Sequence, residues 1–245
     1  MSKLLTLNVK DVLSFFDHLS PASKGHVSAI VGVIGEDLGI SLLRHCLQEL
    51  GIGTRVVTER GVPKTPTNGT GRGHRLDRWL LADPSGDQPR TLYQVEVKNW
   101  SATAIGGKEL RVDASESVIR NYRKERWLSH WDADEGGFRD EIVGKVLGRM
   151  KLPIQMDDES GQLTLILPPF QQTEVEPLVC FWWATHFSGE DESLFRFPLV
   201  NPVNEFPGFW VFSMSNYLRS LKVPEITLEM PSGSTRIDWL NRLFR

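Results

Sequence analysis

The strongest constraint on the fold is one long helical pattern followed by three strand patterns that no helix separates. Apolar residues recur at helical spacing between residues 26 and 50, and Gly51 ends the pattern. The strand patterns cover about residues 54–59, 75–83 and 91–98. Parallel neighbours need a long crossover, so strands that are joined by loops alone pair antiparallel. This part of the chain therefore predicts an α/β fold with a mixed sheet.

The rest of the chain supplies further helices and strands. Helical patterns occur at about residues 8–20, 114–131, 138–149, 215–222 and 235–244. Apolar runs that are typical of strands occur at residues 162–168, 177–187 and 208–214. We predict a single domain over residues 1–245, in which a core at about 26–187 follows the N-terminal helix at 8–20. A C-terminal α/β extension at 188–245 completes the predicted domain.

The composition is that of an ordinary globular protein, with 40% hydrophobic and 24% charged residues. The longest apolar stretches are far shorter than the roughly 20 residues that cross a bilayer, and the N-terminus lacks the apolar segment of a signal peptide. Cys46 and Cys180 lie in apolar surroundings without a partner at metal-ligand spacing. These features predict a cytoplasmic protein without membrane association, whose cysteines are reduced core residues.

The net charge of −3 is unevenly distributed along the chain. Residues 156–245 carry a balance of −6, which leaves +3 for residues 1–155. A phosphate-bearing partner would meet the basic half first, although solvated loop charges are an alternative interpretation. The acidic C-terminal third, which has several phenylalanines beside prolines and glycines, is a candidate surface for a protein partner.

The third strand pattern combines an apolar face with a charged one. Successive side chains alternate, so Val95 and Val97 share one face whereas Glu96 and Lys98 share the other. A solvated surface ion pair is the simplest interpretation of these two charges. The preceding strand favours another, because Asp77 stands in an apolar run where a carboxylate needs a partner or a metal.

Carboxylates on neighbouring strands predict a metal site. Asp77 and Glu96 would repel each other, and a divalent cation removes that repulsion; oxygen ligands suit Mg²⁺, for which Mn²⁺ substitutes. Lys98 beside the cation can orient an attacking water or neutralise charge that develops on a phosphate. Glu36, in the middle of the long helical pattern, is a candidate auxiliary ligand or base, although it also fits the polar edge of an amphipathic helix.

This order of residues resembles the PD-(D/E)XK nuclease superfamily, which has the restriction-endonuclease-like fold. The resemblance covers about residues 26–130, with the strand at 177–187 as the last core strand. It implies an αβββαβ core in which helices flank a mixed central sheet. It also implies one metal-dependent catalytic site, formed by Glu36, Asp77, Glu96 and Lys98. Leu76 stands where the motif has proline. The helix after the strand of Glu96 and Lys98 lacks the glutamine that some resolvase-like members carry, so the subfamily is not identified.

Candidate nucleic-acid-binding residues flank the predicted site. They are Arg72, His74, Arg75, Arg78, Trp100, Lys108 and Arg111. Basic side chains and backbone donors at these positions can hold phosphates, and Trp100 can stack on a base. The alternative interpretations are solvated loop charges and an ordinary connection between a strand and a helix.

The sequence therefore predicts a Mg²⁺-dependent endonuclease or exonuclease that hydrolyses DNA, in restriction, in mobile-element or phage defence, or in DNA repair. The main alternative is a non-cleaving nucleic-acid-binding or assembly subunit with a nuclease-like fold. An RNase is a third option, because the motif reads phosphate and does not distinguish the sugars. Duplex cleavage usually takes two sites, which by analogy favours a homodimer.

Overall fold

The computed structural model describes residues 3–17, 24–56, 78–84, 90–98, 114–132, 147, 154–156, 163–165, 173–186, 188–203 and 206–230. The helices are α1 (Val9–Asp17), α2 (Lys24–Glu49), α3 (Glu116–Asp132) and α4 (Met214–Ser220). The strands are β1 (Lys3–Asn8), β2 (Ile52–Val56), β3 (Arg78–Pro84), β4 (Arg90–Lys98), β5 (Ile154–Met156), β6 (Leu163–Leu165), β7 (Thr173–Phe181), β8 (Leu194–Val203), β9 (Phe206–Ser213) and β10 (Glu225–Met230).

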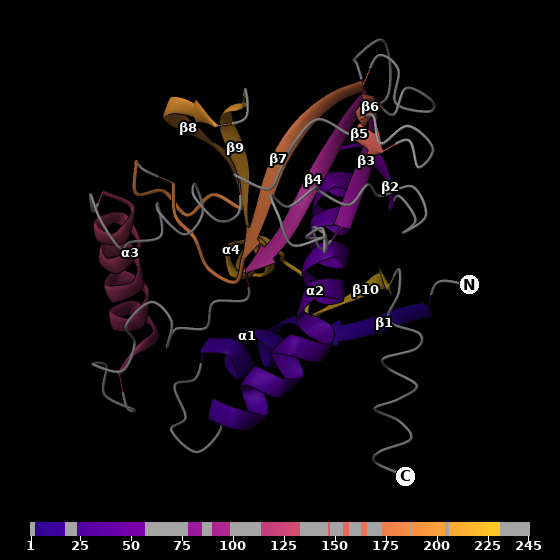
Figure 1. Ribbon diagram of the computed structural model, residues 1–245. Helices are drawn as coiled ribbons and strands as arrows, with labels where there is room; N and C mark the ends of the chain where they lie inside the picture. Colours follow the sequence, from indigo (N-terminus) through magenta and orange to yellow (C-terminus); the bar gives the residue numbers. More distant parts are fainter. Residues whose placement is uncertain are drawn as a thin grey trace.

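Within the described residues, the main sheet has six strands in the order β2-β3-β4-β7-β9-β8 (Figure 1). The strands β2, β3 and β4 pair antiparallel, whereas β4 with β7 and β7 with β9 pair parallel. This confirms the predicted mixed sheet, in which β2, β3 and β4 pair antiparallel. In the C-terminal part, β9 and β8 continue the same sheet, so the predicted extension adds strands directly to it.

Most predicted elements coincide with observed ones, with shifted ends. The helix predicted at 26–50 is α2, and Gly51, with φ of 77°, follows its end in the left-handed conformation that glycine tolerates best. The helices predicted at 8–20, 114–131 and 215–222 are α1, α3 and α4, and the strand predicted at 177–187 is β7, which starts earlier and ends at Phe181. The helix predicted at 235–244 and most of that at 138–149 lie outside the described residues.

Helix α2 lies between the main sheet and the ribbon that β1 and β10 form (Figure 1). On the sheet side, a Cβ atom placed on Gly39 would lie 3.0 Å from Val97 Cγ1 of β4. On the ribbon side, Ser41 Oγ donates a hydrogen bond of 2.9 Å to the Glu229 carbonyl. Residues 37–43 are all buried. A helix covered from two sides in this way is apolar over much of its circumference.

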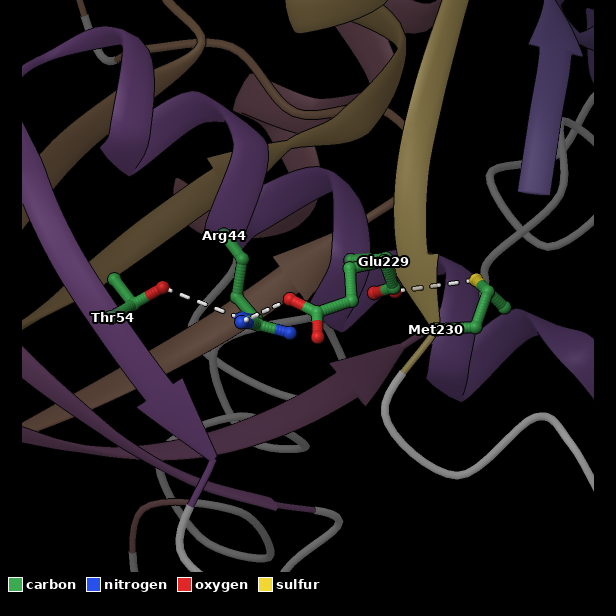
Figure 2. Close-up of polar contacts among 5 residues, drawn as sticks. Arg44, Thr54, Glu229 and Met230 are labelled. Carbon is green, nitrogen blue, oxygen red and sulfur yellow. Dashed lines mark hydrogen bonds and ion pairs between the residues drawn. The ribbon is translucent and has the colours of Figure 1, made fainter. Parts of the chain in front are cut away.

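An ion pair ties the second half of α2 to the ribbon. Figure 2 shows Arg44 of α2 between Thr54 of β2 and Glu229 of β10. Arg44 Nη2 lies 3.0 Å from Glu229 Oε2, and Arg44 Nε donates to Thr54 Oγ1 at 3.4 Å. The Glu229 side chain is 44% exposed, so this pair contributes little to stability.

Helix α3 lies on the opposite face of the main sheet from α2. Val97 points toward α2, so the adjacent Lys98 points the other way. In the parallel ladder Lys98 is level with Phe181 of β7, whose ring meets the ring of Trp127 of α3 edge-on at 4.9 Å. Residues 92–97 of β4 are all buried, so both faces of this strand are covered.

The core holds titratable groups that make the protein sensitive to alkaline pH. Burial, with repulsion from Glu49, raises the pKa of Cys46 from 9.0 to about 11. Burial, with repulsion from Glu176 and against the attraction of Arg196, raises the pKa of Tyr93 from 10.0 to about 12.

Each group contributes its full stabilisation at pH values below its ordinary pKa. This stabilisation is lost as the pH rises through the raised pKa of the folded protein, because the unfolded chain ionises first. We expect the free energy of unfolding to fall between pH 9 and 12. Tyr93→Phe should remove about 2 to 3 kcal/mol of the fall between pH 10 and 12. Urea unfolding at stepwise pH measures it, and a Tyr93→Phe profile parallel to that of wild type would contradict it.

Candidate active site

The structure brings Glu96 and Lys98 together on β4, an inner strand of the main sheet. Lys98 Nζ lies 3.1 Å from Glu96 Oε1, and the two side chains are 23% and 12% exposed. Glu96 is buried, so the two residues do not form the solvated surface ion pair that is the simplest interpretation of the sequence. A carboxylate in such surroundings is stable only when its charge is paired.

The neighbours of this pair on the same face are mostly apolar. Glu96 is level with Val179 of β7, which is level with Val211 of β9, and both valines are fully buried. Lys98 stands at the end of β4, and its ammonium is the more exposed member of the pair. Electrostatic interactions are stronger beside buried apolar side chains than in water. The pair therefore forms a charged site at the carboxyl end of an inner strand.

Glu36 lies on α2 toward the same end of the sheet. Strands β2 and β4 are both antiparallel to β3, and a short turn reverses the chain between α2 and β2, so α2 runs opposite to β4 (Figure 1). Gly39 packs on Val97, and Glu36 precedes Gly39 by three residues, about 4.5 Å along the helix. The half-buried Glu36 is thus displaced toward the end of β4, although α2 covers the face opposite to the Glu96 side chain.

Arg78, a predicted nucleic-acid contact, forms an ion pair inside the fold. Its Nη2 lies 2.7 Å from Asp37 Oδ1 of α2, and the two side chains are 17% and 1% exposed. The antiparallel register sets Arg78 opposite Val95, so both face α2. The ion pair gives Arg78 a structural role, and its contact with nucleic acid stays a prediction. The sequence analysis did not predict this pair. The available signal was Asp37, a second carboxylate beside Glu36 in an otherwise apolar helix.

Several predicted site residues lie outside the described residues. They are Asp77, Arg72, His74, Arg75, Trp100, Lys108 and Arg111. Their roles stay predictions. In the part of the chain that the structure describes, no group of three or more His, Cys, Asp or Glu side chains could hold a metal ion.

Buried polar side chains fix the carboxyl ends of β7 and β9, which lie beside the end of β4. Ser213 Oγ accepts a hydrogen bond of 3.1 Å from the Ala184 amide. Asn216 Nδ2 donates to the carbonyls of Ala184 and Glu192 at 2.9 and 3.1 Å. Ligands of open α/β sheets bind at the carboxyl ends of the strands. These hydrogen bonds fix the carboxyl ends of β7 and β9 next to the charged pair. The sequence patterns did not predict them.

A basic residue of α3 ties this helix to the segment between β7 and β8. Arg120 forms an ion pair with Asp191, in the segment between β7 and β8. Arg123 is only 1% exposed, so its charge lies inside the protein. The contact between Arg120 and Asp191 therefore ties α3 to the segment that follows β7.

Comparison with known proteins does not assign a function, so the functional argument rests on the residues of the site. Within the described ranges, no helix is both long enough and apolar enough to cross a membrane. No protein-family model, curated protein or solved structure matches the chain.

Proposed function

We propose that this protein is a Mg²⁺-dependent nuclease that hydrolyses phosphodiester bonds of DNA, on a restriction-endonuclease-like core. The observation that carries the proposal is the Glu96–Lys98 pair at the end of β4. Apart from the separate β5–β6 sheet between α3 and β7, the elements follow one another in the order α2, β2, β3, β4, α3, β7. That order follows αβββαβ, and the last two strands are parallel neighbours. Topology and chemistry thus agree with the resemblance that the sequence suggests.

The donor atoms of the site suit a hard divalent cation. Lys98 pairs with Oε1 of Glu96, and carboxylate oxygens are the ligands that Mg²⁺ prefers. Glu96, Asp77 and Glu36 are the residues that would hold the ion. A bound cation supplies charge neutralisation at the phosphate.

Lys98 contributes hydrogen-bond donors to the reaction. In hydrolysis, a water oxygen bonds to phosphorus, the bond from phosphorus to the leaving sugar oxygen breaks, and that oxygen takes up a proton. An ammonium has three N–H donors, one of which serves Glu96. The others can orient the water or stabilise the charge on a phosphate oxygen. Glu36 is the candidate base for the proton that the water loses.

The proposal is tested by incubating the protein with plasmid, linear duplex and single-stranded DNA in Mg²⁺, in Mn²⁺ and in EDTA. We expect cleavage that requires a cation, and a parallel RNA substrate separates a DNase from an RNase. Glu96→Gln should abolish cleavage and weaken Mn²⁺ binding in calorimetry at least tenfold, because it removes a ligand charge. Glu225→Gln, at an exposed site on β10, is the matched control. DNA binding without cleavage, and without Mn²⁺ affinity that depends on Glu96, would favour the non-cleaving subunit.

A further inference from the structure

Two basic side chains of α3 lie against the segment between β7 and β8 (Figure 1). Arg120 forms an ion pair with Asp191 of that segment. A Cβ atom placed on Gly189 would lie 2.8 Å from Lys124 Cε, so the stem of this lysine packs on the same segment. Residues that are four apart are neighbours on the surface of a helix. Arg120 and Lys124 therefore form a basic ridge on α3.

Neighbouring side chains of α3 anchor this basic ridge in the core. Arg123 and Trp127 are 1% and 0% exposed, and the ring of Trp127 meets the ring of Phe181 edge-on. Phe181 is the last residue of β7 and is level with Lys98, the last residue of β4. Groups on a packed helix are held more precisely than groups on loops. The basic ridge is thus fixed at the end of the sheet that carries Lys98.

An acidic turn, residues 188–192, covers the basic ridge. It contains three consecutive exposed acidic residues, Glu190, Asp191 and Glu192. Thr185 Oγ1 donates a hydrogen bond of 2.9 Å to the Glu190 carbonyl. Asn216 Nδ2 donates a hydrogen bond of 3.1 Å to the Glu192 carbonyl. The carboxylate between these two anchored residues is therefore presented to the ridge from a fixed backbone.

The ion pair between Arg120 and Asp191 is exposed and can be exchanged. The two side chains are 42% and 36% exposed. Exposed ion pairs contribute little to stability, so a competing anion can replace the carboxylate without unfolding the turn. The planar guanidinium binds phosphate through the same fork of N–H donors that it offers to a carboxylate. Phosphate is therefore the ligand that the basic ridge favours once Asp191 leaves.

We propose that the basic ridge binds the phosphate backbone of DNA, and that Asp191 occupies the ridge in the free protein until a phosphate displaces it. The acidic turn thereby competes with DNA and lowers its affinity. Contacts to the backbone position a protein on DNA and carry no sequence information. The inference rests on the proposed function, because it takes DNA as the partner, but it requires neither the cation nor cleavage.

A double-mutant cycle separates displacement of Asp191 from the general effect of its charge. The affinity for a labelled duplex is measured by fluorescence anisotropy in EDTA, which prevents cleavage, and circular dichroism confirms that each variant is folded. Asp191→Asn should tighten binding about twofold to fivefold, the equivalent of one exposed ion pair. In an Arg120→Gln background the same change should leave the affinity unchanged, because the carboxylate no longer has a guanidinium to occupy.

Single variants of the basic ridge test the contact with the backbone. Arg120→Gln and Lys124→Gln should each weaken binding about threefold to tenfold, as expected for the loss of one phosphate contact. Arg196→Gln is the matched control, because it removes the same charge from another exposed ion pair, with Glu176 of β7. This control should bind DNA as tightly as wild type.

Two outcomes overturn the inference and leave the proposed function standing. In the first, Asp191→Asn tightens binding equally with and without Arg120, so the turn acts only through its general charge. In the second, the Arg120 and Lys124 variants bind DNA as tightly as the Arg196 control. Wild type that binds no DNA overturns both proposals. Binding through the ridge without cleavage in Mg²⁺ supports the inference and overturns the proposed nuclease alone.

Discussion

Replacing Lys98 with glutamine should reduce the rate of DNA cleavage by about 10² to 10³-fold, the usual loss when one preorganised donor to a developing charge is removed. The ammonium lies 3.1 Å from Glu96 Oε1, so the change removes a donor next to the carboxylate that is proposed to bind the cation. Mn²⁺ binding should persist or tighten, because a neighbouring positive charge is lost. Loss of turnover with retained metal binding distinguishes a catalytic lysine from a structural one.

The measurement is single-turnover cleavage of duplex DNA at saturating Mg²⁺, together with Mn²⁺ calorimetry on the same preparations. Lys10→Gln, at an exposed position of α1, removes the same charge and should behave as wild type. Equal cleavage rates for wild type and Lys98→Gln on every substrate would show that the catalytic assignment is wrong.

Replacing Arg78 alone with glutamine should lower the free energy of unfolding by about 3 kcal/mol or more, because it leaves the Asp37 carboxylate buried without its cation. Asp37 is 1% exposed, so water cannot replace the missing partner. The double variant Asp37→Asn with Arg78→Gln should lose less, since no buried charge remains.

Urea unfolding provides the comparison, with Arg44→Gln as the matched single variant. That change leaves Glu229, whose side chain is 44% exposed, so the loss should stay below about 1 kcal/mol. Losses of the same size for Arg78→Gln and Arg44→Gln would contradict a buried pair at Asp37.

The parts of the site that depend on a local sequence pattern could be predicted. Alternation along β4 predicted that Glu96 and Lys98 share a face away from Val97, and their ion pair and the Gly39–Val97 contact agree with this. The break after α2 was equally local, because Gly51 adopts the positive φ that other residues avoid.

Contacts between distant segments could not be predicted in the same way. Asp37 and Arg78 stand 41 residues apart, and nothing in either local pattern specifies their pairing. The ribbon that covers α2 pairs the first described strand with the last, and Thr6 and Thr227 face each other across it. Short strands with many polar residues, such as β1 and β10, are stabilised mainly by such pairing, so their intrinsic signal is weak.

A crystal structure soaked with Mn²⁺ tests the proposed metal site most directly, because the anomalous signal locates the ion. We expect one ion bound by the Glu96 carboxylate at about 2.1 Å, with oxygens of Glu36 and Asp77 completing the protein ligands and Lys98 adjacent. Glu96 still paired only with Lys98, with Mn²⁺ absent from the site at saturating concentration, would contradict the metal-dependent nuclease.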